Sequence, residues 1–174
     1  MILAVPLRLA DPPAPTADAL YRQYARYVAR LAFRLVGRDG DVDDLVQDVF
    51  LAATAAKVKS SNEHELKGWL STVTVRLASK RLRRRRLARF FGFDDAPDER
   101  LLSPGASPEM VTLVAQLYRR LDSLPTAERL AWTLRHVENE PLEEVARVCG
   151  CSLATAKRRI AAVQAALTET DHEA

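Results

Sequence analysis

The sequence has few of the residues on which several classes of protein depend. It contains two cysteines, Cys149 and Cys151, and three scattered histidines, His64, His136 and His172. This set offers no Cys/His spacing suited to a structural metal site. We therefore expect both cysteines to be reduced packing residues, as in a cytoplasmic protein. A phosphate-binding glycine loop and a nucleophile elbow are also missing, so no motif indicates an enzyme or a bound cofactor.

Glycine and long hydrophobic runs are also scarce. Only 6 of the 174 residues are glycine, although 48% are hydrophobic. The hydrophobic positions recur at intervals of three and four residues almost throughout, which is typical of amphipathic helices. The apolar start, MILAV, has no basic leader, is interrupted by Pro6 and Arg8, and is too short to cross a bilayer. We predict an all-α, cytoplasmic protein without membrane insertion, preceded by a disordered arm over residues 1–16.

A change in composition after Phe91 divides the helical pattern. Residues 92–108 read GFDDAPDERLLSPGASP, with four acids, three prolines and two glycines, which predicts an exposed linker. The chain is long enough for two small domains. We expect one helical domain over 17–91 and a second over 109–170. Within the second domain, Thr126 is predicted to cap a helix over 127–137.

The predicted helix that begins at Asp41 has two contrasting faces. At 100° per residue, one side collects apolar residues and should face the core: Val42, Leu45, Val46, Val49 and Ala53. The opposite side carries four polar residues and one leucine: Asp43, Asp44, Gln47, Asp48 and Leu51. A single exposed leucine is common and needs no explanation. The alternative is a docking face, where acids attract a partner and Leu51 becomes buried against it.

The next predicted helix, over residues 66–89, changes character along its length. Its first half has apolar residues at helical spacing, which predicts a buried face: Leu66, Trp69, Leu70, Val73 and Leu77. Its second half has no acid and carries eight cations: Arg76, Lys80, Arg81, Arg83, Arg84, Arg85, Arg86 and Arg89. Eight unpaired cations cannot be buried, so we expect this end to be exposed. It is either a solvated charged face or a surface that holds a polyanion.

The most specific pattern lies between Pro141 and Leu167. We predict a short helix, a sharp turn at Gly150 and a second helix capped by Ser152. The inward residues of the second helix are expected to be Leu153, Ala156, Ile160, Val163 and Leu167. Its outer face is small and basic, with Ala154, Arg158, Ala161 and Ala162 flanked by Thr155, Lys157 and Arg159. This arrangement is typical of a helix-turn-helix that enters the DNA major groove, although an ordinary helical hairpin is the alternative.

In this order, the segments resemble the bacterial RNA polymerase sigma factors of the sigma-70 family, specifically the small two-domain extracytoplasmic-function group. DDLVQDVFL resembles the helix that docks on the polymerase clamp, which implies core polymerase binding by Asp43, Asp44, Gln47, Asp48 and Leu51. GWLSTVTVRLASKRLRRRR resembles the segment that reads the minus-ten element, which implies DNA binding by Arg76, Lys80, Arg83, Arg84, Arg85 and Arg86. The C-terminal segment resembles the minus-thirty-five domain, with contacts at Ser152, Thr155, Lys157, Arg158 and Arg159.

The resemblance implies a non-enzymatic subunit that directs RNA polymerase core enzyme to promoter DNA and is regulated by a separate anti-sigma factor. The chain departs from the family at three positions. Arg76 and Lys80 stand where members commonly have Asn and Asp, and Ala162 replaces a basic residue. Cations at the first two positions favour phosphate over base contacts. The alternative function is a helix-turn-helix regulator that no longer binds core polymerase.

Overall fold

The structure is a computed structural model that describes residues 16–37, 41–56, 58, 62–91 and 107–171. These residues form helices and no strand, which confirms the all-α prediction. The helices are α1 (Ala17–Val36), α2 (Val42–Ala55), α3 (Glu63–Phe90), α4 (Pro108–Ser123), α5 (Thr126–His136), α6 (Leu142–Val148) and α7 (Leu153–Asp171). Residues 1–15 of the predicted arm and 92–106 of the predicted linker lie outside the described residues. None of the described helices is both long and apolar enough to cross a membrane.

Local hydrogen bonds and backbone conformation explain where α1 begins and ends. The Thr16 hydroxyl accepts a hydrogen bond from the Ala19 amide at 3.2 Å and caps the first turn. At the other end Gly37 has φ 69°, a left-handed conformation that glycine adopts without a steric penalty. Its amide donates to the Phe33 carbonyl at 2.7 Å.

Helices α1, α2 and α3 pack together as the N-terminal half. The predicted core face of α2 is buried as expected, and Phe50 joins it. On α3, the buried residues lie on one side of the helix: Leu66, Leu70, Ser71, Thr74, Val75, Ala78 and Leu82. The predicted stripe was therefore partly wrong, since Trp69, Val73 and Leu77 are only half-buried. Thr74 can be buried in the core because its hydroxyl donates to the Leu70 carbonyl at 2.7 Å, which satisfies its polar group.

Helices α4 to α7 form the C-terminal half. Gly150 has φ 60°, and the Ser152 hydroxyl accepts from the Thr155 amide at 3.2 Å, so the predicted turn and cap before α7 are confirmed. Two predictions were wrong. Pro125, and not Thr126, precedes the first turn of α5, and Thr126 is buried. Leu153 is 38% exposed, because it is the first residue of α7 and lies at the end of the helix interface.

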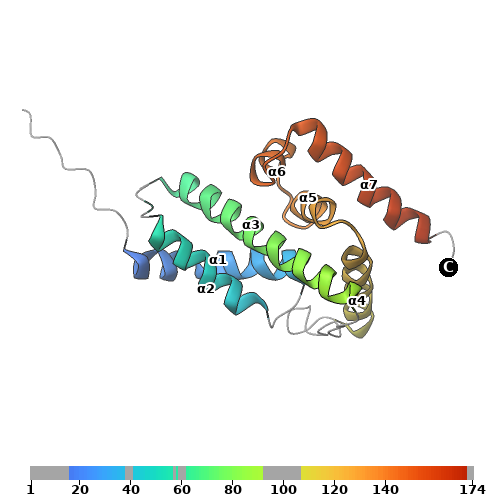
Figure 1. The fold of residues 1–174 in the computed structure, drawn as a ribbon, viewed down its shortest axis with the longest axis horizontal. Coiled ribbons are helices and arrows are strands. Elements are labelled where there is room, and N and C mark those ends of the chain that lie inside the picture. The colour runs from blue at the N-terminus through green and yellow to red at the C-terminus, as the bar shows by residue number, and fades with distance from the viewer. Residues whose placement is uncertain (1–15, 38–40, 57, 59–61, 92–106, 172–174) are drawn as a thin grey trace, which may run out of the picture.

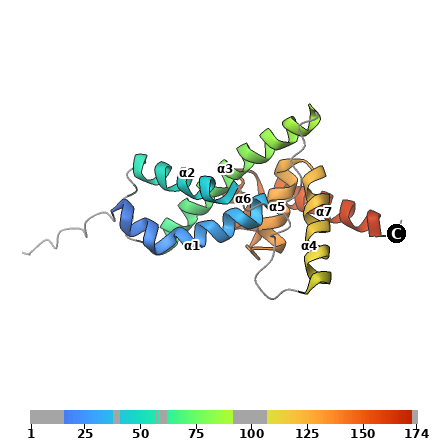
Figure 2. The same cartoon turned by 90° about the horizontal axis from the view of Figure 1, so that it is seen from below.

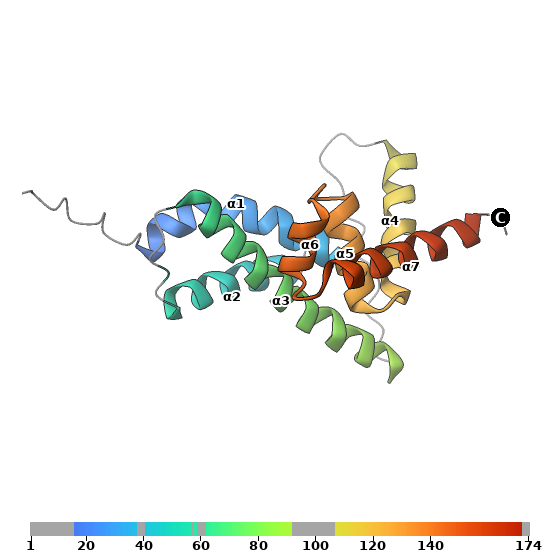
Figure 3. The same ribbon diagram turned by 90° about the horizontal axis from the view of Figure 1, so that it is seen from above.

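The two halves are packed against each other. Helix α3 lies between α1 and α2 on one side and α5 and α6 on the other, and α4 stands across one end of the molecule (Figures 1, 2 and 3). Leu31 and Leu70 of the first half belong to the same buried cluster as Leu130, Leu134 and Val145 of the second. Both halves therefore bury apolar surface in a shared interface, which favours their association.

A buried arginine joins the halves at the C-terminal end of α1. Arg129 of α5 is only 2% exposed and donates to the carbonyls of Leu35 at 3.0 Å and Val36 at 3.2 Å. These carbonyls lie in the last turn of α1, where no intrahelical donor is available. Burial lowers the pKa of Arg129, while its ion pair with the Asp122 carboxylate opposes that shift. The pair keeps a cation inside the interface and uses it to cap a helix from the other half.

Tyr118 of α4 makes a second polar contact at the same place. Its hydroxyl donates to the Arg34 carbonyl at 2.9 Å, and its ring lies against Gly37. A Cβ atom at Gly37 would overlap the Cδ1 atom of Tyr118, so this close approach requires glycine. The Arg34 guanidinium also pairs with Glu138 at 3.0 Å. The interface between the halves thus combines apolar packing with directional polar contacts.

Candidate functional site

The predicted docking face lies on the outer side of α2. Its five residues, Asp43, Asp44, Gln47, Asp48 and Leu51, are all exposed, and Leu51 is 60% exposed. Asp48 also accepts from Arg81 of α3 at 2.7 Å. Helix α2 therefore presents an apolar side chain surrounded by acids, with Asp48 shared between this face and the packing of α3.

A groove of about 460 Å³ runs beside Leu51, between α1 and α2. Its lining consists of Ala17, Tyr21, Asp43, Val46, Gln47, Phe50, Leu51 and Thr54. Tyr21 is 50% exposed, and its ring packs edge-on against Phe50 with 5.0 Å between centroids. The sequence pattern did not single out Tyr21, although this aromatic residue lies outside the buried face of α1, which is a signal that the sequence offers. The groove can accept an apolar side chain, with acids at its rim.

The basic half of α3 is divided into paired and unpaired cations. Arg81 donates to the Asp41 carbonyl at 2.8 Å as well as to Asp48, and Arg85 donates to the Val36 carbonyl at 3.0 Å and pairs with the Asp41 carboxylate. Both side chains are half-buried. The expectation of eight unpaired, exposed cations was therefore wrong for these two, and also for Arg89, which is half-buried and pairs with Asp122. The partners of Arg81 and Arg85 lie at least 33 positions earlier in the chain: Val36 ends α1, Asp41 precedes α2, and Asp48 lies within α2.

The other cations of this helix form an exposed row. Arg76, Lys80, Arg83, Arg84 and Arg86 are exposed, and none of them forms an ion pair with another described residue. Arg89 lies 3.8 Å from Asp122. Exposed, unpaired guanidinium groups on a rigid helix are suited to phosphate oxygens, which they can bind in a bidentate manner. Arg85 is the one predicted DNA-binding residue of α3 that the structure instead engages in internal contacts.

Helix α7 carries the predicted recognition residues on its outer surface. Ala154, Lys157, Arg158, Ala161 and Ala162 are exposed, as the helical pattern predicted. Ser152 and Thr155 have hydroxyls 2.9 Å apart at the N-terminus of the helix. Arg159 is half-buried and points away from this surface, toward the first half of the molecule. Small residues around Arg158 leave room for a groove floor to approach closely.

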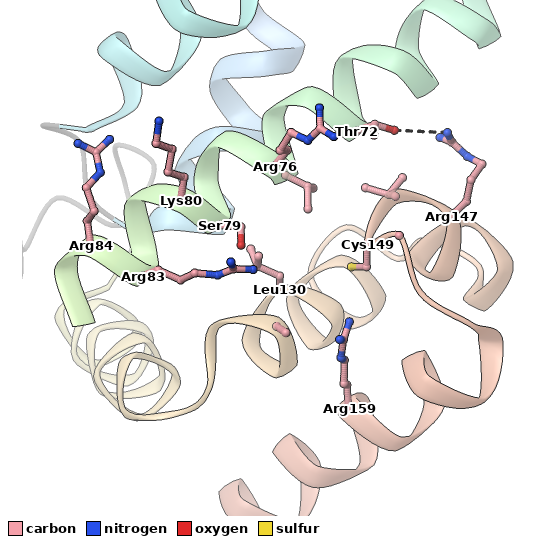
Figure 4. A pocket seen from close by; sticks show the side chains of 14 residues that line it. Thr72, Arg76, Ser79, Lys80, Arg83, Arg84, Leu130, Arg147, Cys149 and Arg159 are labelled. Atoms are coloured by element: carbon pink, nitrogen blue, oxygen red, sulfur yellow. Dashed lines mark hydrogen bonds between the residues drawn. The ribbon is translucent and has the colours of Figure 1, made fainter. Parts of the chain in front are cut away.

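A cleft between the halves brings several candidate residues together. This basic cleft has a volume of about 690 Å³ and is lined by Thr72, Val75, Arg76, Ser79, Lys80, Arg83 and Arg84 of α3 and by Ala127, Leu130, Arg147, Val148, Cys149, Gly150 and Arg159 of the second half (Figure 4). Two predicted DNA-binding segments, far apart in the sequence, therefore meet at one cavity. The docking face on α2 is not part of it.

Cys149 and Cys151 lie at the turn before α7, and Cys149 also lines the basic cleft. No three His, Cys, Asp or Glu residues in the described parts of the chain come together as a metal site. Cys149 and Cys151 are free thiols, as predicted. Burial, with a smaller contribution from Cys151, raises the pKa of Cys149 to about 11. Cys149 is therefore almost entirely in the unreactive thiol form at neutral pH.

Comparison with known families separates the chain into the same two parts. The family described as "Sigma-70 region 2" matches residues 20–88, and "Sigma-70, region 4" matches residues 115–163. The chain is similar to the "ECF RNA polymerase sigma factor SigE" of Mycolicibacterium smegmatis, with 34% identity over 84% of this chain and 58% of the relative. It is also similar to the "ECF RNA polymerase sigma-E factor" of Escherichia coli, with 31% identity over 82% of this chain and 80% of the relative.

Solved structures share the fold. The sigma factor RpoE of Bartonella quintana, in complex with the anti-sigma factor NepR, matches with a TM-score of 0.62 and 22% identity over 86% of this chain and 92% of that chain. CnrH, in complex with the cytosolic domain of CnrY, matches with a TM-score of 0.60 and 24% identity over 90% of this chain and 88% of that chain. Thus the sequence comparisons identify relatives, and the structural ones establish a shared two-part helical architecture.

Proposed function

We propose that this chain, which belongs to the extracytoplasmic-function group of RNA polymerase sigma factors, directs the core enzyme to particular promoters and starts transcription there. The chain spans only 58% of the mycobacterial relative's length, so its own activity and partners are inferred from the surfaces it presents. We place its action in the cytoplasm, where relatives of this class act on polymerase. Polymer synthesis would belong to the core enzyme, and the sigma factor would contribute no catalytic group.

The observation that carries this function is the exposed groove beside Leu51. The exposed Leu51 side chain, beside Tyr21 and Phe50, is suited to burial against a partner helix. The acids Asp43 and Asp44 would attract a basic partner and set its orientation. We assign core polymerase binding to the docking face, with Tyr21 as an additional contact.

Two further surfaces support promoter recognition. The exposed row on α3, Arg76, Lys80, Arg83, Arg84 and Arg86, would hold the DNA backbone near the minus-ten element, with only a supporting role for Arg85. Arg158 on α7 would read bases of the minus-thirty-five element, while Lys157 would hold phosphate. Ser152 and Thr155 would position the start of the helix near the backbone.

Regulation by a separate protein is part of the proposal. The sigma factor RpoE, which has the same fold, was solved in complex with the anti-sigma factor NepR, and CnrH, also of this fold, was solved in complex with the cytosolic domain of CnrY. We infer that this chain is likewise held inactive by a protein partner. The partner would be identified as the protein that co-purifies with the chain in preparations that contain no core polymerase.

A run-off transcription assay tests the function directly. Purified chain and core polymerase should produce discrete transcripts from a subset of genomic promoter fragments, and core polymerase alone should not. A Leu51→Arg variant should lose these transcripts while retaining DNA binding by the C-terminal half. The comparisons do not favour the alternative of a regulator without polymerase binding. That alternative would be supported only if the chain bound promoter fragments and failed to co-purify with core polymerase.

A further inference from the structure

The basic cleft gathers positive charge from both halves without any lining acid. Arg76, Lys80, Arg83 and Arg84 come from α3, and Arg159 comes from α7. None of these five forms an ion pair among the described residues. Like charges around one cavity raise the local positive potential, and the low dielectric of the cleft walls strengthens it. The cleft is therefore suited to a multiply charged anion.

Two arginines from opposite halves point into this space. In Figure 4, Arg83 reaches from α3 toward Leu130, and Arg159 reaches from α7 toward Cys149. The walls between them include the buried side chains of Val75, Leu130 and Val148. Guanidinium groups bind phosphate oxygens in a bidentate manner, and apolar walls can accept a flat, uncharged part of a ligand. This combination favours phosphate over a simple carboxylate or halide.

The shape of the cleft favours a compact ligand over a long strand. Its volume of about 690 Å³ lies within the range of small-molecule sites. At one end, the Arg147 side chain bridges the halves, donating to the Gly68 carbonyl at 3.2 Å and the Thr72 hydroxyl at 3.3 Å. Glu144 holds this arginine at 2.5 Å. An extended nucleic-acid strand passing through the cleft would have to break this bridge, whereas a compact anion leaves it intact.

We propose that the basic cleft binds a compact polyphosphate, either inorganic or carried by a nucleoside. Because Arg83 and Arg159 belong to different halves, the anion binds the packed arrangement of the halves more tightly than a separated one. The same residues lie in the predicted DNA-binding segments, so the bound anion competes with DNA for them. Anion binding is a property of the purified chain and does not depend on the proposed promoter function.

Isothermal titration of the full chain, without DNA or polymerase, tests the site. Sodium tripolyphosphate and ATP are the two probes, compared at one ionic strength. Saturable binding with one anion per chain is expected. Arg83→Gln and Arg159→Gln should each weaken it about tenfold, as expected for the loss of a charge-assisted hydrogen bond. Arg26→Gln, which removes an exposed charge on α1 outside the cleft, should leave the affinity unchanged.

The two probes distinguish the sources of the phosphate. Tighter binding of ATP supports a nucleoside ligand that uses the apolar walls, whereas equal or tighter binding of tripolyphosphate supports an inorganic one. Circular dichroism of each variant checks that the helices are retained. Non-saturable binding, or an equal loss with Arg26→Gln, would overturn the proposal. It would also be overturned if Arg83→Gln and Arg159→Gln weakened the binding of a single-stranded oligonucleotide and left the affinity for tripolyphosphate unchanged.

Discussion

Leu51 is exposed at a point where Tyr21 and Phe50 form the wall of a groove. We expect Leu51→Arg to weaken core polymerase binding by about 2 kcal/mol or more, because it replaces a buried contact with a charge that must be desolvated. The fold should be unaffected, since this side chain contributes to no buried cluster. Fluorescence titration of labelled core polymerase measures the change.

The matched control for Leu51 is Gln23→Arg, which adds the same charge at an exposed position of α1 outside the groove. It should bind core polymerase like the parent chain. If Leu51→Arg also binds like the parent chain, Leu51 is a solvent-exposed leucine and α2 is not the docking face.

Arg158 and Lys157 are neighbours on α7 with different expected roles. Arg158 lies among small residues that permit close approach to a groove floor, so Arg158→Ala should cost about 1 to 3 kcal/mol on the preferred upstream element and relax preference at one base pair. Lys157→Ala should weaken binding to all sequences about equally, because a lysine bound to phosphate does not distinguish bases. Binding to single-base variants of the element separates the two. A uniform reduction with Arg158→Ala would make Arg158 a backbone contact only.

Helix α3 carries exposed cations and internally paired cations in one run. Arg83 and Arg84 are exposed, so replacing both by Ala should reduce the slope of log affinity against log salt by about 0.7 to 0.9 for each phosphate group that is no longer neutralised. The measurement is holoenzyme binding to a promoter fragment between low and moderate salt. An unchanged slope would mean that this row is merely solvated.

Arg81 and Arg85 provide the contrasting pair on the same helix. Each donates to a backbone carbonyl and to an aspartate of the N-terminal half. Replacing either by Ala should lower the free energy of unfolding by about 1 to 3 kcal/mol, because the variant cannot form these hydrogen bonds from a charged donor. The salt slope of DNA binding should not change. Urea unfolding checks the first expectation. A lowered salt slope with normal stability would instead assign the substituted residue to the DNA-binding surface, as the sequence predicted for Arg85.

For the whole molecule, the interface between the halves depends on Arg129. Its guanidinium pairs with the Asp122 carboxylate and also donates hydrogen bonds to the last two carbonyls of α1. Arg129→Met should lower the free energy of unfolding by about 3 to 5 kcal/mol, because a buried carboxylate loses its main partner. Urea unfolding followed by circular dichroism measures this, with the exposed Arg119→Met as control.

A double variant identifies the cause of that destabilisation. If the cost arises from the unpaired carboxylate, Arg129→Met combined with Asp122→Leu should recover part of the stability, since both charges are then removed. A double variant whose loss of stability equals the sum of the two single losses would show that Arg129 and Asp122 are not coupled, and the unpaired carboxylate would then not be the cause. The single Asp122→Leu variant includes the cost of losing the contact with Arg89, which lies 3.8 Å away.

Local patterns in the sequence predict the helical class and the order of the main motifs. Caps and turns such as Thr16, Gly37, Gly150 and Ser152 act on backbone groups within four residues, so they can be recognised locally. The periodicity of α2 placed its core face and its exposed face correctly for the same reason. The motif order also led to the family, which the comparisons confirm.

The pairing of the charged residues depends on contacts between helices that no local pattern reveals. Arg85 contacts Asp41 and Val36, more than forty positions away, and no local pattern separates it from Arg84. Tyr21 of α1 lines the groove because its ring packs against Phe50 of α2. Arg159 points toward α3 because α7 packs on α5 and α6. Ion pairing and burial depend on neighbours that folding brings together. The free energy of burying or pairing a charge is therefore set by the packed molecule. The shared core and the basic cleft therefore followed from packing between helices that the sequence separates.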